Sequence, residues 1–187
     1  NGKEGTRGIL AGSSDEPASL DWLERCKTSF KSTLRVETVE GGMPARARYN
    51  GAMLVRTDLV LFLDADMMLT NPTVIKETVE RMQRGDIDLL TTTVETEEGY
   101  NHLYKAFYWF QILLRDLLKN PFAIGGFQLW STDAYERVGG WIPDHLFAED
   151  FHISRRVSPK RMEITKIAGV WTSARRFKAR GKLWMMK

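Results

Sequence analysis

Apolar runs alternate with amphipathic patterns along the chain, which is typical of an α/β domain. Strands are predicted at residues 6–11, 34–40, 59–63 and 88–94. Helices are predicted between them at residues 17–32, 45–56 and 71–85. This succession predicts a Rossmann-like, mostly parallel mixed sheet flanked by helices, because right-handed crossovers join strands that run the same way.

The second part of the chain is less regular. Its predicted elements are a helix at residues 100–118, a strand within 122–130, helices at 131–138 and 149–157, and a strand at 162–170. A chain of 187 residues fits one domain, so a single domain is predicted over residues 1–187.

The apolar run from Leu59 to Leu63 is typical of a strand that is buried on both faces, and we expect it to be central. It ends in Asp64-Ala65-Asp66, whose carboxylates would project from one side of an extended chain. Ligands of open α/β sheets bind beyond the carboxyl ends of strands. Carboxylate pairs there suit Mg²⁺ or Mn²⁺. A solvated polar strand end is the alternative.

A second acidic pair, Glu149 and Asp150, opens a predicted helix. Carboxylates are favoured at that position by the helix dipole, so the pair alone is explained by stability as readily as by catalysis.

Charge is divided unevenly along the chain. Residues 1–154 carry 16 Lys/Arg and 23 Asp/Glu (16 − 23 = −7), whereas residues 155–187 carry 11 and 1 (11 − 1 = +10). The basic tail is suited to phosphates of a small ligand, an anionic membrane or a nucleic acid, or it is a solvated surface. The aromatic helix at 100–118 either packs in the core, forms a hydrophobic acceptor groove, or forms an interfacial face for lipid-linked acceptors.

Other bulk features restrict the environment that we expect. Cys26 is a single cysteine, so a disulfide framework within the chain is excluded and a reducing compartment is expected. The polar start at residues 1–7 resembles no secretory signal, and no apolar stretch is long enough for a membrane span. A cytoplasmic location, with contact at the membrane surface as a further option, is therefore predicted.

Three stretches together resemble the family 2 glycosyltransferases, which have the GT-A fold. Residues 47–51 (ARYNG) are similar to that family's A-R-N-x-G start, and residues 60–67 (VLFLDADM) are similar to its metal motif. The third stretch combines Gly125-Gly126-Phe127, Gly139-Gly140-Trp141 and Glu149-Asp150, and it resembles the acceptor-side block. The resemblance implies a nucleotide-sugar-binding half at 1–95, an acceptor half at 96–170 and a basic tail at 171–187.

The resemblance also implies roles for matching residues. Asp66 would bind the metal, Asp64 would share it or bind the ribose, and Asp150 would be the general base. The nucleotide and its diphosphate would be contacted by Ser13, Ser14, Glu40, Arg46, Arg48, Arg175 and Arg176. The sugar or the acceptor would be contacted by Gly125, Gly126, Trp141 and Glu149.

The implied reaction is a metal-dependent transfer of one sugar, with inversion, from a UDP- or GDP-sugar to a sugar, lipid-linked or protein acceptor. The cofactor would be Mn²⁺ or Mg²⁺. Two departures from the family pattern affect this expectation: Gly12-Ser13-Ser14-Asp15-Glu16 replaces P-x-x-N-E, and Tyr49 replaces an asparagine. The Q-x-x-R-W of processive members is absent, which favours the transfer of a single sugar.

Three other classes compete with this interpretation. A nucleotidyltransferase that makes sugar nucleotides needs a Gly-rich basic loop after the first strand, but residues 12–16 are acidic. A nucleic-acid-binding module is disfavoured by the net negative body and by the lack of a recognised motif, so no nucleic-acid partner is expected. A non-catalytic sugar-nucleotide-binding relative is disfavoured by the presence of both Asp66 and Asp150.

Overall fold

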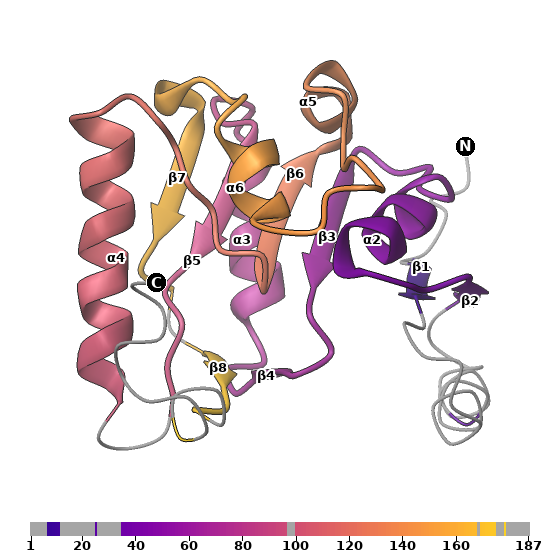
Figure 1. Ribbon diagram of the computed structural model, residues 1–187, viewed down its shortest axis with the longest axis horizontal. Coiled ribbons are helices and arrows are strands. Elements are labelled where there is room, and N and C mark those ends of the chain that lie inside the picture. The colour runs from indigo at the N-terminus through magenta and orange to yellow at the C-terminus, as the bar shows by residue number, and fades with distance from the viewer. Residues whose placement is uncertain are drawn as a thin grey trace. The chain divides into compact units, whose positions relative to one another are not determined.

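A computed structural model describes residues 7–11, 25, 35–96, 100–167, 169–174 and 178 (Figure 1). Contacts divide the chain into two compact units. Unit 1 comprises Asn1–Thr57 and Gly139–Glu149, and unit 2 comprises Asp58–Val138 and Asp150–Lys187. The helix predicted at 17–32 lies outside the described residues except for Arg25, which is helical.

Unit 1 contains the first two predicted strands. β1 (Arg7–Ala11) pairs in parallel with β2 (Arg35–Val39), with Arg7 opposite Arg35 and Ala11 opposite Val39. A parallel pair cannot be joined by a tight hairpin turn, and residues 12–34 lie between the two strands in the sequence. Both strands agree with their predicted positions within one residue at each end.

α2 (Pro44–Ala52) follows β2 and contacts both strands of unit 1. Pro44 lies in the first turn, where its missing amide costs nothing. Ala45 and Ala47 are buried, so small side chains form the packed face. The side-chain amide of Asn50 donates to the carbonyl of Glu40 (2.8 Å), which ties α2 to the end of β2. The helix ends before the predicted residue 56.

Unit 2 contains a four-stranded mixed sheet in the order β3-β6-β5-β7. Its strands are β3 (Leu59–Leu63), β6 (Phe127–Ser131), β5 (Leu89–Thr92) and β7 (Met162–Thr165). β6 is antiparallel to both of its neighbours, whereas β5 and β7 are parallel. Three of the four strands therefore run in one direction, but two of the three neighbouring pairs are antiparallel, so the mixed sheet is confirmed and its mostly parallel pairing is not.

β3 is not buried on both faces as expected. Val60 and Phe62 are buried, Leu59 and Leu61 are half-buried, and Leu63 is 39% exposed. β3 is the first strand in the sheet order, whereas β5 has a neighbour on each side and is buried along its whole length. A continuous apolar run such as residues 59–63 is therefore compatible with a strand at the end of the strand order as well as with a fully buried strand.

Helices cover both faces of this sheet (Figure 1). α3 (Val74–Met82) packs on one face through Val74, Thr78 and Met82, which are four residues apart and buried. The core between α3 and the sheet contains Val74, Met82, Ile87, Leu90, Val94, Phe127, Leu129 and Val170. α5 (Thr132–Arg137) and α6 (Glu149–Ser154) follow later in the chain.

α4 (Asn101–Asp116) is the predicted aromatic helix, and it lies at the β7 side of the sheet (Figure 1). Gln111 is buried, and its side-chain amide donates to the carbonyl of Phe122 (3.0 Å). The inner side of α4 is therefore tied to the segment that returns to β6. Within the described residues, no helix is both long enough and apolar enough to cross a membrane.

The strand predicted at residues 162–170 is two strands. β7 ends at Thr165, and β8 (Val170–Thr172) pairs antiparallel with a strand that was not predicted, β4 (Met67–Leu69). The chain leaves β7 and turns at Gly169, whose φ is +115°. Only three residues form β4, too few for a recognisable period-two pattern.

α6 ends at Ser154 and not at the predicted residue 157. The residues after it form a turn that is tighter than an α-helix, in which the amide of Val157 donates to the carbonyl of Ser154 (3.1 Å). Ser158 is extended because it precedes Pro159, which starts the short 3-10 helix η1 (Pro159–Arg161).

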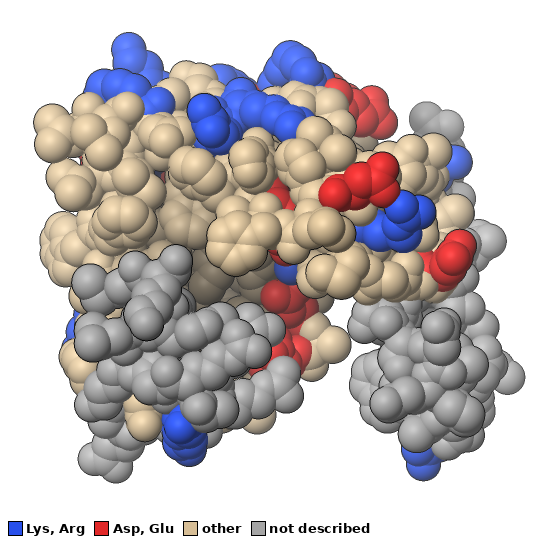
Figure 2. Space-filling view, in the orientation of Figure 1, with Lys and Arg blue, Asp and Glu red and all other residues tan. Residues whose placement is uncertain are grey.

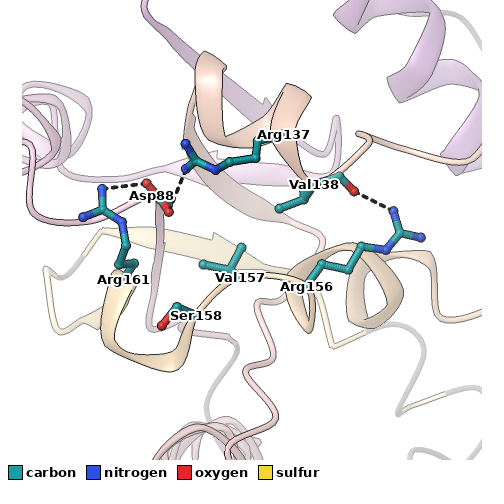
Figure 3. Close-up of a pocket in the computed structure, with 7 residues that line it drawn as sticks. All are labelled: Asp88, Arg137, Val138, Arg156, Val157, Ser158 and Arg161. Atoms are coloured by element: carbon teal, nitrogen blue, oxygen red, sulfur yellow. Dashed lines mark hydrogen bonds and ion pairs between the residues drawn. The ribbon is translucent and has the colours of Figure 1, made fainter.

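The amino-terminal end of the parallel strands carries a charged cluster around a hollow (Figure 3). Asp88, buried just before β5, accepts from Arg161 (2.8 Å) and from Arg137 at the end of α5 (3.1 Å). The hydrogen bond from Arg161, followed by the positive charges of Arg161 and Arg137, holds the pKa of Asp88 below its usual value. The cluster joins the segments that precede β5 and β7.

Replacing Asp88 with Asn is expected to lower the free energy of unfolding by roughly 1–2 kcal/mol at pH 7, since both arginines are partly exposed. The folded-state pKa of Asp88 is lower than the unfolded-state pKa of about 4, so its stabilisation is complete above pH 4. It is lost as the pH falls through the folded-state value. Urea unfolding of both proteins between pH 7 and pH 3 should show their difference shrinking at acid pH. Glu136→Gln, an exposed change on α5, should change the stability by less than about 0.5 kcal/mol.

Gly169→Ala is expected to destabilise the fold by roughly 3 kcal/mol, because strain and overpacking add. An added Cβ would lie 2.2 Å from Cβ of Asn71 and 2.8 Å from its backbone nitrogen. Gly85→Ala is the matched control, since Gly85 also has a positive φ of +77° but open space around its Cα; it should cost about 1 kcal/mol. Equal losses in thermal unfolding would contradict the close approach at Gly169.

Candidate functional site

The Asp64-Ala65-Asp66 triplet lies in a turn at the carboxyl end of β3, and not on an extended chain as expected. The amide of Met67 donates to the carbonyl of Asp64 (3.0 Å), and β4 begins at Met67. Asp64 is half-buried and Asp66 is exposed. The period-two rule for strands does not hold in such a turn, so a shared direction of the two carboxylates does not follow from their spacing.

The Gly125-Gly126 pair lies beside this turn, where β6 begins. The amide of Asp64 donates to the carbonyl of Gly126 (3.2 Å), next to the registered pair of Leu63 and Phe127. A Cβ built on Gly126 would lie 1.8 Å from the Cε methyl of Met67. Glycine therefore lets the Met67 side chain pack directly against this backbone.

The same glycine pair contacts Asp150. The amide of Gly125 donates to Oδ2 of Asp150 (3.0 Å), and the amide of Phe151 donates to Oδ1 (2.8 Å). The hydroxyl of Ser154 donates to the Asp150 carbonyl (2.6 Å). Both carboxylate oxygens are therefore oriented by backbone amides, so the carboxylate has a defined direction at the start of α6.

Aromatic rings connect α6 to the inner side of α4. The Phe122 ring meets the Phe151 ring edge to face at 5.5 Å, and it meets the Phe107 ring of α4 in the same way at 5.4 Å. Such pairs stabilise beyond their buried area. Phe122 lies three residues before Gly125, so this aromatic row supports both the glycine turn and the residue after Asp150. Sequence reasoning missed the role of Phe122, because its partners are distant in the sequence.

Unit 1 holds a second set of predicted residues. Nη1 of Arg48 donates to Oε1 of Glu149 (2.7 Å), and its guanidinium lies 4.9 Å from the ring centroid of Trp141. Trp141 is 1% exposed, and the side chains of Arg48 and Glu149 are 12% and 18% exposed. A charged hydrogen bond and a cation–π contact act together here. The three residues form one cluster, and Glu149 directly precedes Asp150 in the chain.

The backbone before this acid pair is strained. Ala148 has a φ of +52°, which L-residues other than Asn and Asp rarely adopt. Such outliers gather at functional sites, because the surrounding contacts maintain them.

The other predicted residues are spread more widely. Glu40 is exposed at the end of β2, and exposed Arg46 pairs with Asp144 (2.5 Å). Ser13, Ser14, Arg175 and Arg176 lie outside the described residues. Within the described residues, no cluster of three or more His, Cys, Asp or Glu side chains is arranged to hold a metal.

The hollow in Figure 3 lies at the other end of the sheet from these acids. It is lined by Asp88, Arg137, Val138, Arg156, Val157, Ser158 and Arg161. Two of its arginines are paired with Asp88, and Arg156 donates to the carbonyl of Val138 (3.0 Å). None of the residues predicted to bind donor or acceptor lines it.

Comparisons with known proteins agree with this architecture. The model of the family "Glycosyl transferase family 2" matches residues 9–139, and Asp150 lies beyond that match. A search of curated proteins found no match.

Two solved structures share the fold. The mannosyltransferase PcManGT from Pyrobaculum calidifontis, in complex with GDP-Man and Mn²⁺, has a TM-score of 0.62 and 15% sequence identity, covering 87% of this chain and 46% of that chain. TarS 1-349 of S. aureus has a TM-score of 0.64 and 12% identity, covering 89% and 51%. The chain thus spans about half the length of these structures.

The family match extends over most of the chain, and the α/β architecture with a mixed sheet agrees with both solved structures: the chain belongs to glycosyl transferase family 2 and has the GT-A fold.

Proposed function

We propose that this chain transfers one sugar from a nucleotide-diphosphate donor to an acceptor hydroxyl with inversion, using Asp64 and Asp66 for a divalent metal and Asp150 as the general base. The acceptor oxygen forms a bond to the anomeric carbon while the bond from that carbon to the diphosphate oxygen breaks. The nucleoside diphosphate leaves with the electron pair, and the hydroxyl proton passes to Asp150. A single displacement of this kind inverts the anomeric centre.

One observation carries the proposal: both acidic motifs of unit 2 bond to the same glycine pair. Asp64 bonds to Gly126 through its amide, and Asp150 bonds to Gly125 through its carboxylate. The two motifs are 84 residues apart (150 − 66 = 84). Their convergence on one turn supports a shared site in which donor and base act together.

Asp64 and Asp66 suit a divalent cation, since they supply hard oxygen donors in one turn. Mg²⁺ is commonly held by one or two carboxylates, with water and substrate phosphates as the other ligands, so two protein carboxylates are sufficient. When bound, such an ion offsets the charge that develops on the departing diphosphate. The GDP-Man and Mn²⁺ in the PcManGT structure support a nucleotide sugar and a divalent metal as the probes to test first.

Asp150 has the geometry that a base requires. Its Oδ2 accepts from the amide of Gly125 and its Oδ1 accepts from the amide of Phe151, and a carboxylate oxygen is a group that can take up a hydroxyl proton. The amides hold the carboxylate in one direction, so the group does not need to be ordered at the moment of reaction.

Two alternatives lead to different products. A nucleotidyltransferase would release pyrophosphate from a nucleoside triphosphate and a sugar phosphate. A non-catalytic relative would bind the sugar nucleotide without turnover. Product analysis with a panel of UDP- and GDP-sugars, with simple sugars and lipid-linked sugars as acceptors, separates these outcomes from transfer.

Asp150→Asn is expected to lower the transfer rate by about 10²–10⁴-fold, because the amide cannot accept the acceptor proton. Donor binding should be unchanged, since the Asn oxygen can still accept from the Gly125 amide. Initial rates and isothermal titration with the donor measure both effects. Asp133→Asn, an exposed change on α5, is the matched control. Weakened donor binding in the Asp150 variant would contradict its assignment as the base.

Asp66→Asn is expected to weaken donor binding at least about tenfold in the presence of Mn²⁺ and to leave metal-free binding nearly unchanged, because a carboxylate ligand is lost. Titration of the nucleoside diphosphate with and without Mn²⁺ gives the comparison. Asp133→Asn, an exposed acid on α5, should behave like the parent chain. Identical metal dependence in the Asp66 variant and the parent would show that the metal is held elsewhere.

A further inference from the structure

α4 is apolar on the side that faces solvent as well as on the side that packs. Trp109, Leu113 and Leu117 follow one another at four-residue spacing and are 62%, 47% and 69% exposed. Phe110 and Leu118 add to the same surface at 48% and 60%. Leu117 and Leu118 directly follow the last residue of α4, and we call these five residues together the outer face of α4.

This outer face departs from the usual pattern of a surface helix. A helix on a globular protein normally presents charged and polar residues to water opposite its packed stripe. The inner side of α4 already supplies that stripe, through buried Gln111 and the ring of Phe107 against Phe122. Contiguous exposed apolar surface, unlike scattered apolar residues, marks a site of interaction.

Positive charge borders the outer face. Lys105 and Lys119 are exposed near its two ends, and Nζ of Lys166 lies 5.8 Å from the ring centroid of Trp109. The acid on α4 is Asp116, which is paired with Arg115 (2.6 Å). In Figure 2 the α4 side of unit 2 is almost entirely free of acidic residues, and Lys and Arg gather along the upper edge of the unit.

We propose that the outer face of α4 lies on an anionic phospholipid surface. Trp109, Phe110 and the leucines would enter the boundary between headgroups and acyl chains, as the apolar side of an interfacial helix does. Lys105, Lys119 and Lys166 have long stems that let their ammonium groups reach lipid phosphates at that boundary. The proposal goes beyond the transfer reaction and does not depend on it.

The bordering charges favour lipid over a second copy of this chain. A two-fold dimer through the outer face would place the same patch against itself. Lysines at both ends of α4 would then approach lysines of the other copy, and the paired Asp116 offers little compensation. An anionic surface complements all three lysines at once. The other basic residues of 155–187 add to the attraction, although their contribution is separable by mutation.

Vesicle flotation tests the proposal with the whole chain. Vesicles of phosphatidylcholine containing about one third phosphatidylserine should carry the chain upward at low salt, whereas pure phosphatidylcholine should carry much less. Replacing Trp109, Leu113 and Leu117 together with Ser should lower the bound fraction at least about tenfold, because each buried apolar side chain contributes strongly to partitioning. These side chains are exposed, so the thermal midpoint of the variant should match that of the parent.

Two further double variants test whether the location of the apolar side chains and the positive charge of the lysines matter for binding. Met53→Ser with Met68→Ser removes exposed apolar side chains elsewhere (59% and 55% exposed) and should leave flotation unchanged. Lys105→Glu with Lys119→Glu should reduce binding to the anionic vesicles and leave the weak binding to neutral vesicles unchanged.

Other outcomes would overturn the proposal. Undiminished flotation of the triple Ser variant would show that other residues, such as the basic segment at 155–187, attach the chain to lipid. Absence of flotation, together with a dimer in light scattering that the triple Ser change dissociates, would assign the outer face to a second copy of the chain. Because no donor or acceptor is present in the assay, either failure is distinct from a failure of the proposed transfer reaction.

Discussion

Two hydrogen bonds made by the backbone of Gly125 and Gly126 join both acidic motifs of unit 2 to one turn. The Gly126 carbonyl accepts from the amide of Asp64, and the Gly125 amide donates to the carboxylate of Asp150. Backbone groups are rigid donors and acceptors, so they position acids more reproducibly than flexible side chains would. The turn also requires a residue without a side chain at 126, because Met67 occupies the adjoining space. The proposed site therefore depends on a glycine pair that carries no chemistry of its own.

One side of α4 packs against the protein, and the other side is exposed to solvent. Its inner side contacts Phe122, which in turn contacts Phe151, so the packing of a distant helix bears on the residue after Asp150. Its outer side carries five large apolar side chains that are 47–69% exposed. A helix that is apolar all round is ordinarily buried. This physical mismatch, and not any motif, is the basis for the proposed lipid contact.

Acidic residues lie at both ends of the mixed sheet, in different surroundings. At the carboxyl end of β3, Asp64 and Asp66 follow the strand in a turn, where a cation could offset their charge. At the opposite end, Asp88 is already neutralised by Arg137 and Arg161, which holds its pKa low. Paired with two arginines, Asp88 stabilises the fold, whereas the binding role that we propose for Asp64 and Asp66 rests on their place in the turn after β3.

The sequence by itself determined most of the described strands and helices, the family and the acidic motifs, because local periodicity and short motifs depend on neighbouring residues. Only the tertiary structure decided that residues 162–170 form two strands, that β3 is the first strand of its sheet, and that Asp64-Ala65-Asp66 forms a turn. It also decided that Arg48 binds Glu149 and Trp141, and which side of α4 meets solvent. These features depend on partners tens of residues away, and no local pattern encodes which partner a strand end or a helix face will meet.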